Sequence, residues 1–389
     1  MKPPAPELDP TSRNHGIDLL RGLSILLVVL HHIGLRIPLK KTLLGGFLPG
    51  PLLSALNWNG YEAVFIFFVI SGFLITGNTL KRWRTLPRVD IKAFYARRFA
   101  RIVPCLVALV AVLSALHLVG AGDYVIHREG QSLPRAIFAA FGLHLNWYEG
   151  MKGYLPGGWD VLWSLSIEEV FYIGFPIVCL LTRRTWVLVP ILALLALSLP
   201  WTHAALKGNE IWQEKAYLPG MSAIAIGVMG ALAAERWRAP SPWQIRVLAW
   251  AGATGLLATL VAGAAVWHLL RDGYLLLLCF SALALCLAFA KRPPRAVRGL
   301  GWLRSWGRLS YEIYLTHMFV VFGIVRLFCA RGGDLRTGFL WYIPTVILCW
   351  LLGLAVERFV STPCERWLKG RMLESQPPVF MAGTGFSPR

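Results

Sequence analysis

Long runs of apolar residues alternate with short polar connections along almost the whole chain. A helix needs about 20 mostly apolar residues to cross a bilayer. The pattern therefore predicts an all-α, polytopic transmembrane helix bundle of about ten spans, at residues 17–37, 61–79, 101–120, 160–182, 186–200, 218–234, 243–265, 273–290, 308–329 and 338–360. We expect one membrane domain over 17–371, with polar tails at 1–16 and 372–389.

An eleventh apolar stretch, residues 133–148, is short and interrupted by polar side chains such as Arg135 and Asn146. Connections on the cytoplasmic side of membrane proteins are enriched in lysine and arginine. Ten spans with a cytoplasmic N-terminus place the basic run at 81–102 inside, whereas an eleventh span would move the basic cluster at 291–308 outside. We therefore expect both termini in the cytoplasm and the segment 121–159 on the outer side, with 133–148 at most partly embedded.

The composition supports a membrane protein and excludes other classes. Hydrophobic residues make up 56% of the chain and charged residues 15%, against about 25% charged residues in soluble domains. A net charge of +19 would suggest nucleic acid in a soluble protein, but here the basic residues lie between apolar segments and orient the chain. The seven cysteines form no CxxC pair, which favours buried thiols over disulfides or metal ligands.

Ionisable side chains inside apolar helices are costly, so each marks a candidate functional position. The first segment carries Asp18, Arg21, His31 and His32. Asp18 and Arg21 are three residues apart, and Arg21 and His32 are eleven apart, so these three share one helix face. Arg21 and His32 are separated along that face by about 16 Å.

The fourth segment begins with WSLSIEEVFY and runs from outside to inside, which places Glu168 near the depth of His32. A carboxylate and an imidazole at one depth could form a general base and its orienting partner. The alternative is a structural pair that holds two helices together. In the ninth segment, His317 could line the same cavity or form a hydrogen bond within the bundle.

Two further groups of residues have a functional and a structural interpretation. Arg98 and Arg101 share a helix face at the cytoplasmic entrance to the third segment. Arginine suits phosphate oxygens, although such residues also anchor topology. In the second segment, Ser71 and Gly72 are small residues that permit close helix approach, which favours packing over catalysis for Ser71.

Five motifs occur in order along the chain. They are DLLRGLSILLVVLHH at 18–32, FFVISGFLI at 67–75, RRFARIVP at 97–104, WSLSIEEVFYIGFP at 163–176 and GRLSYEIYLTH at 307–317. Together they resemble the motifs of the acyltransferase-3 family of membrane-bound acyltransferases, of the carbohydrate O-acyltransferase type. The chain departs from the family pattern at Phe65, Val170, Ser222 and Ser361, where many members have Asp, Gln, Asp and Glu.

The resemblance implies a cytoplasmic acyl-CoA donor, commonly acetyl-CoA, a carbohydrate or glycoconjugate acceptor and a place in a bacterial inner membrane. No tightly bound cofactor, metal or nucleic-acid partner is expected. On the basis of this resemblance, we expect His32 to act as general base and Glu168 as its partner. An acyl-His32 relay is a variant of this mechanism. Arg21, Arg98 and Arg101 are the expected donor-binding residues, and Asp18, Ser71 and His317 are possible pocket residues.

The acceptor remains open at the level of sequence. The aromatic side chains of the outer segment, Trp147, Tyr148, Tyr154 and Trp159, could stack on sugar rings or could form an interfacial belt. Acylation of a small molecule such as a macrolide and transfer of succinyl are alternatives. A different class of protein, a transporter of a lipid-linked sugar or a proton-coupled solute, would also use buried His and Glu, but the chain shows no inverted-repeat halves.

Overall fold

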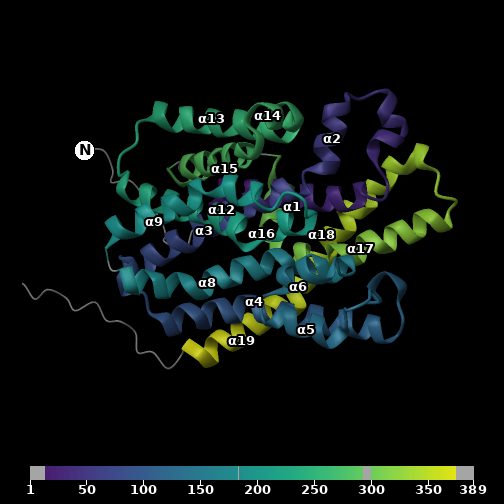
Figure 1. Cartoon of the computed structure of the whole chain (residues 1–389), viewed down its shortest axis with the longest axis horizontal. Coiled ribbons are helices and arrows are strands. Elements are labelled where there is room, and N and C mark those ends of the chain that lie inside the picture. Colours follow the sequence, from purple (N-terminus) through teal and green to yellow (C-terminus); the bar gives the residue numbers. More distant parts are fainter. Residues whose placement is uncertain (1–13, 183, 292–298, 374–389) are drawn as a thin grey trace, which may run out of the picture.

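The computed structural model describes residues 14–182, 184–291 and 299–373, and these residues form helices without any strand (Figure 1). The α-helices run in chain order as α1 (His15–Gly34), α2 (Gly50–Trp58), α3 (Gly60–Trp83), α4 (Ile91–Leu118), α5 (Leu133–Phe141), α6 (Leu145–Lys152), α7 (Gly157–Asp160), α8 (Leu162–Thr182), α9 (Thr185–Leu197), α10 (Leu199–Ala204), α11 (Glu210–Lys215), α12 (Tyr217–Arg236), α13 (Pro242–Val261), α14 (Gly263–Leu270), α15 (Tyr274–Lys291), α16 (Gly301–Arg308), α17 (Ser310–Ala330), α18 (Tyr342–Val356) and α19 (Thr362–Leu373).

Ten helical stretches within the described residues are long and apolar enough to cross a membrane. Each coincides with one of the ten predicted segments, so the predicted polytopic all-α bundle is confirmed. The stretch 133–148 forms the two short helices α5 and α6 and does not span. The placement of both termini in the cytoplasm stays a prediction.

Two spans extend beyond their predicted ends. α4 begins at Ile91, ten residues before the predicted start, because the Asp90 side chain accepts a hydrogen bond from the Ala93 amide and caps the helix. The basic residues of the third motif therefore lie on a helix. The last span continues past α18 through one π-helical turn, Glu357–Ser361, into α19.

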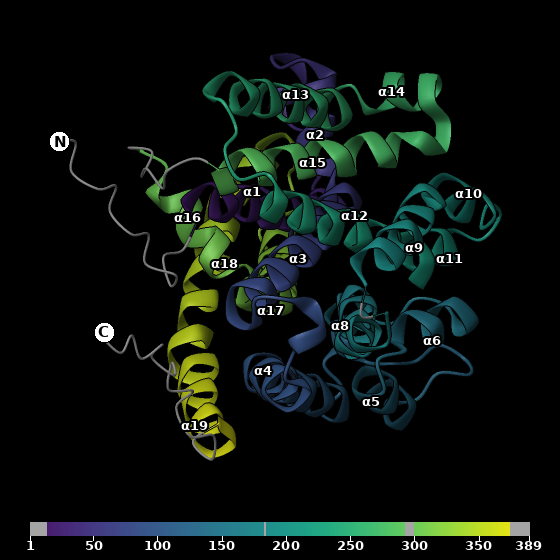
Figure 2. The ribbon, with the colours of Figure 1, turned by 90° about the vertical axis from the view of Figure 1, so that its left-hand side faces the viewer.

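α1, α3, α12 and α17 occupy the middle of the bundle, with α13 and α15 above them and α4, α5 and α8 below in Figure 2. Glycines let α3 and α12 cross at backbone contact. A Cβ atom on Gly72 would lie 2.1 Å from the Ile224 carbonyl oxygen, and one on Gly227 would lie 2.0 Å from that of Val69. This crossing confirms the predicted packing role of Gly72.

Glycines also let α1 and α16 pack at backbone contact. A Cβ atom on Gly22 would lie 2.0 Å from the Leu303 carbonyl oxygen, and one on Gly307 would lie 1.8 Å from that of Asp18. Because the backbones touch, the first turns of α1 are fixed against the short helix that leads into α17. Arg21 and Ser310 are thereby brought within hydrogen-bond distance, 2.7 Å between the Arg21 Nη2 and the Ser310 Oγ atoms.

Candidate active site

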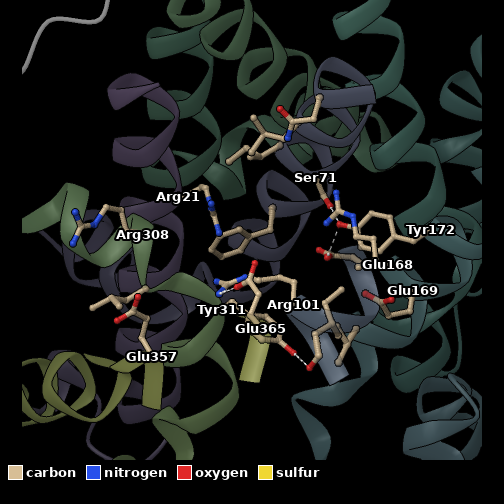
Figure 3. A pocket seen from close by; sticks show the side chains of 18 of the residues that line it. Arg21, Ser71, Arg101, Glu168, Glu169, Tyr172, Arg308, Tyr311, Glu357 and Glu365 are labelled. Atoms are coloured by element: carbon tan, nitrogen blue, oxygen red, sulfur yellow. Dashed lines mark hydrogen bonds and ion pairs between the residues drawn. The ribbon is translucent and has the colours of Figure 1, made fainter. Parts of the chain in front are cut away.

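A cavity of about 670 Å³ opens between α1, α3, α4, α8, α17 and α19, near the N-terminal end of α1 (Figure 3). Charged groups dominate its wall. The ionisable side chains that line it are Arg21, Arg98, Arg101, Glu168, Glu169, Tyr172, Arg308, Tyr311, Glu357 and Glu365. The structure thus brings the three predicted donor-binding arginines to one cavity. We call it the arginine cavity.

The arginines of this cavity differ in what they contact. Arg101 forms ion pairs with Glu312 at 3.0 Å and with Glu365 of α19 at 3.4 Å. The Arg98 guanidinium lies over the Tyr172 ring, 4.4 Å from its centroid. Arg308 ends α16 and is exposed on the cavity wall. Arg101 is therefore tied to protein carboxylates by ion pairs, whereas Arg98 lines the cavity beside Glu168 and Glu169, and Arg308 is exposed on its wall.

Glu168 and Ser71 also lie on the wall of the arginine cavity. The Tyr172 hydroxyl donates a hydrogen bond to the Glu168 carboxylate at 3.2 Å, and it also forms a short hydrogen bond with the Ser71 hydroxyl. Ser71 therefore faces the cavity and not the α3–α12 crossing, which corrects its predicted packing role. The sequence shows that Ser71 is next to Gly72, but it does not show in which direction the Ser71 side chain points.

A narrower cavity of about 100 Å³ continues the arginine cavity into the bundle, since both are lined by Arg21, Glu168 and Tyr311. At its far end the Ser164 and Tyr314 hydroxyls form a hydrogen bond of 2.7 Å. The Tyr314 ring lies 6.0 Å from the His317 ring. Tyr314, which lines the narrower cavity, therefore lies next to His317, which lines neither cavity.

His317 and His32 lie side by side, with ring centroids 5.0 Å apart. The His317 Nδ1 atom is 2.7 Å from the Tyr314 carbonyl oxygen, and because a carbonyl only accepts, Nδ1 must donate. In the neutral ring the Nε2 atom then holds a lone pair, and this atom is buried without a hydrogen-bond partner among the described residues. His317 is thus oriented as a proton acceptor, and His32 beside it is partly exposed.

The expected pairing of His32 with Glu168 is not present, since no hydrogen bond joins the two side chains among the described residues. His32 has His317 and His31 as ring neighbours, and Glu168 has Tyr172. α1 packs against α3, α16 and α17, and α8 is not among its main partners. Depth along a helix was derivable from sequence, but the rotation of each helix about its axis was not.

Asp18 lies apart from the arginine cavity. It is buried and lines a different cavity of about 470 Å³, together with Asn78, Lys81 and Lys291. Arg21, Leu74 and Asn78 line both spaces, so they form the wall between them. The structure places Asp18 behind Arg21 and not within reach of the Glu168 side of the arginine cavity.

Most aromatic groups proposed for the outer segment are part of its packing. Trp159 is fully buried, and Tyr148 is buried with its hydroxyl accepting a hydrogen bond from the Ser132 amide. Trp147 is exposed and packs edge-on against Trp212 at 4.9 Å. Tyr154 lies over the Lys215 ammonium at 4.3 Å. Stacking of a sugar on Tyr148 or Trp159 is therefore excluded in this conformation.

A buried charge cluster ties the outer segment to α11. Lys215 donates to Glu149 at 2.8 Å and forms a short hydrogen bond with Asp160. The other Glu149 oxygen accepts from the Leu155 amide at 2.9 Å. Burial, followed by repulsion from Asp160, raises the pKa of Glu149 well above its ordinary value, and Lys215 opposes this shift. We call Lys215, Glu149 and Asp160 the Lys215 cluster.

Sequence reasoning missed Arg308, Tyr172 and the Lys215 cluster. Arg308 is the second residue of the GRLSYEIYLTH motif, and Tyr172 lies one helical turn after Glu168, so both positions carried a signal. Lys215 and Glu149 are 66 residues apart, and nothing in the sequence pairs them. Among the described residues, no group of three His, Cys, Asp or Glu side chains is placed to hold a metal ion.

The profile of a family described as an acyltransferase domain matches residues 14–356. The peptidoglycan O-acetyltransferase OatA of Listeria monocytogenes is 28% identical over 210 residues, 52% of this chain and 29% of that protein. The O-acetyltransferase OatA of Staphylococcus aureus strain NCTC 8325 is 29% identical over 168 residues, 42% of this chain and 24% of the relative. The chain thus matches only about a quarter of the length of these relatives. No solved structure shows significant similarity to it.

Proposed function

The chain belongs to the acyltransferase-3 family, and on this premise we propose that it is a membrane O-acyltransferase that moves an acetyl group from acetyl-CoA to a hydroxyl of a carbohydrate. The observation that carries the proposal is that the arginine cavity narrows towards Tyr314, whose ring lies 6.0 Å from that of His317, and that His317 packs beside His32. Similarity to proteins named O-acetyltransferase and peptidoglycan O-acetyltransferase supports the acetyl group and a glycan acceptor. The predicted orientation supports a bacterial inner membrane.

The donor is held by its phosphates in the arginine cavity. Arg98 and Arg308 offer guanidinium groups to phosphate oxygens, and Arg21 stands at the entrance to the narrower cavity. Arg101 stabilises the cavity wall through its ion pairs with Glu312 and Glu365. The pantetheine arm extends beside α1 past Tyr314, over roughly the 16 Å that separates residues 21 and 32 along a helix.

The reaction takes place at the two histidines. His32 removes the proton from the acceptor hydroxyl, the oxygen attacks the thioester carbonyl carbon, and the carbon–sulfur bond breaks. The imidazolium returns its proton to the departing CoA thiolate, so charge and atoms balance. The His317 Nε2 lone pair faces no competing donor, and it stabilises the proton on His32. In the relay variant, the His32 nitrogen first takes the acetyl group and then passes it to the acceptor.

The decisive experiment uses purified full-length protein in nanodiscs with radiolabelled acetyl-CoA and a glycan acceptor. We expect His32→Ala to lower transfer about 100- to 10,000-fold, the usual contribution of a general base, with unchanged donor binding and thermal stability. His127→Ala is the matched control, because His127 is exposed and bonds only to the nearby Val125 carbonyl. Normal turnover of His32→Ala would remove His32 from the mechanism, and solute flux without acyl transfer in the wild type would favour a transporter.

A further inference from the structure

Two hydroxyl groups meet at the far end of the narrower cavity, and together they carry one proton more than their mutual hydrogen bond uses. Ser164 of α8 and Tyr314 of α17 both line this cavity, and their hydroxyl oxygens are 2.7 Å apart. Each hydroxyl has one proton to donate and can also accept. Neither side chain forms another hydrogen bond to any of the described residues. One O–H group of the pair is therefore left without an acceptor among these residues.

The wall of the narrower cavity does not supply that acceptor. Glu168 accepts its hydrogen bond from the Tyr172 hydroxyl. The Ser310 hydroxyl accepts from Arg21. Apolar side chains complete the wall, namely those of Val64, Phe67, Leu165 and Leu315. Because buried donors are nearly always paired, the acceptor has to come from whatever occupies the cavity.

Tyr314 links this hydroxyl pair to the histidines. Its ring lies 6.0 Å from the His317 ring, and its backbone carbonyl oxygen accepts a hydrogen bond from His317 Nδ1 at 2.7 Å. A phenol ionises more readily than an alcohol, so it is the better donor. A hydroxyl that accepts one hydrogen bond also donates a stronger one. Donation from Ser164 to Tyr314 is therefore favoured, and it leaves the Tyr314 proton for the cavity.

We propose that the Tyr314 hydroxyl donates a hydrogen bond to the carbonyl oxygen of the donor thioester, and that Ser164 strengthens this bond. The inference rests on the proposed function, in which the acyl-pantetheine arm enters the narrower cavity. With about 100 Å³ of space, this cavity is smaller than the roughly 300–1,000 Å³ of a whole small-molecule site, so it suits a slender arm. A thioester carbonyl accepts without donating, which matches a spare O–H group.

The bond to Tyr314 strengthens as the reaction proceeds. When the acceptor oxygen attacks the carbonyl carbon, the π electrons of the carbonyl bond move to its oxygen, which becomes an oxyanion beside the Tyr314 proton. The carbonyl bond then forms again, the carbon–sulfur bond breaks, and its electron pair leaves with sulfur. Tyr314 keeps its proton throughout, so its contribution is the electrostatic stabilisation of the oxyanion.

Turnover of acetyl-CoA by the full chain in nanodiscs tests this role. Tyr314→Phe removes only the hydroxyl, and we expect it to lower kcat about 100- to 1,000-fold, the effect of losing one oxyanion donor. KM for acetyl-CoA should change by no more than about tenfold, because the bond to the ground state is weaker. Ser164→Ala should lower kcat by about tenfold or less, because Tyr314 keeps its own proton.

Tyr217→Phe is the matched control, because the Tyr217 hydroxyl donates to the Leu143 carbonyl and Tyr217 lines neither cavity. It should turn over acetyl-CoA as the wild type does, and the melting temperatures of all three variants should show that they fold. A normal kcat for Tyr314→Phe would overturn the inference, as would a kcat that falls equally in Tyr217→Phe.

Two unreactive donor analogues separate this inference from the proposed function. One is the methyl ketone in which a methylene group replaces the sulfur of acetyl-CoA, and the other is S-ethyl-CoA, which has no carbonyl. Calorimetry should show that the wild type binds the ketone about three- to tenfold more tightly than S-ethyl-CoA, and that Tyr314→Phe binds both alike. The infrared stretch of a carbon-13-labelled ketone should lie at lower frequency in the wild type than in Tyr314→Phe.

The outcomes of the analogue experiment differ for the two proposals. Equal affinity of the wild type for the two analogues, or a ketone stretch unchanged by Tyr314→Phe, would overturn the role of Tyr314 while leaving acetyl-CoA as the donor. Failure of the wild type to bind either analogue would overturn the proposed donor, and this inference with it.

Discussion

The Lys215 cluster and the arginine cavity both hold charged side chains within the helical bundle, but they differ in how those charges are balanced. In the Lys215 cluster, a lysine that is 2% exposed meets two carboxylates directly. In the arginine cavity, Arg98 and Arg308 line about 670 Å³ of open space. The first arrangement is satisfied within the protein, and the second leaves open space that the proposed donor would fill.

This difference distinguishes charge that stabilises the fold from charge that the proposed donor would use. Removing one partner of a buried pair leaves the other charge unpaired at a cost of about 3–5 kcal/mol. Removing Arg98 or Arg308 breaks no ion pair found among the described residues. Substitutions of charged residues should therefore lower mainly stability in the Lys215 cluster and mainly activity in the arginine cavity.

Lys215→Met should have the largest effect on stability. It leaves Asp160 without its cation and the buried Glu149 without its hydrogen-bond donor, so we expect a loss of about 3–5 kcal/mol in the free energy of unfolding. Thermal unfolding in detergent measures this loss. Lys207→Met is the control, because Lys207 pairs with Asp272 from a half-exposed position. A melting temperature equal to that of the wild type would show that the Lys215 cluster does not hold the outer segment.

Within the arginine cavity, substitutions of Arg98 and of Arg101 should have different effects. Arg98→Leu should raise the KM for acetyl-CoA about tenfold or more, the value of a charged hydrogen bond, with stability preserved. Arg101→Leu should lower stability by several kcal/mol, because Glu312 is fully buried and would lose its cation. Donor titration and thermal unfolding of both variants measure this contrast. If both variants lost only donor affinity, Arg101 would belong with the binding arginines.

Glu149 should give the Lys215 cluster a dependence on pH. Because its pKa is raised in the folded protein, folding takes up a proton there. The stability that this contributes is complete below the ordinary pKa of Glu and is lost as pH rises through the raised one. Glu149→Gln mimics the protonated form, so we expect it to change stability by only about 1 kcal/mol and to flatten the profile of melting temperature against pH. An unchanged profile would mean that Glu149 stays ionised beside Lys215.

The exposed pair of Asp123 and Arg326 should contribute least to stability. Arg326 is 56% exposed, so solvent screens its interaction with Asp123. Asp123→Asn should cost about 0–1 kcal/mol and leave donor turnover unchanged. Chemical denaturation in detergent provides the comparison with Lys215→Met. If Asp123→Asn lowered the free energy of unfolding as much as Lys215→Met does, burial would not explain why the two ion pairs differ.

Sequence predicted the spans because length and apolar character are local properties. It also grouped Arg21, Arg98 and Arg101 as donor-binding residues, and these three line one cavity. Glu168, which was expected beside His32, lines the same cavity. It could not predict that His317, and not Glu168, lies beside His32, since this depends on how α1, α8 and α17 are rotated. The Lys215 cluster was likewise hidden, because its members come from separate short helices that meet only in the folded chain.

The glycine crossing of α3 and α12 also determines which parts of the bundle can move. With backbone atoms in contact at Gly72 and Gly227, the two helices form a rigid unit that resists sliding. On the other side of the arginine cavity, α19 follows the π-helical turn and contacts α4 through the Arg101–Glu365 pair at 3.4 Å. The arginine cavity is therefore bounded by a fixed wall at α3 and, at α19, by a wall that this ion pair holds in place.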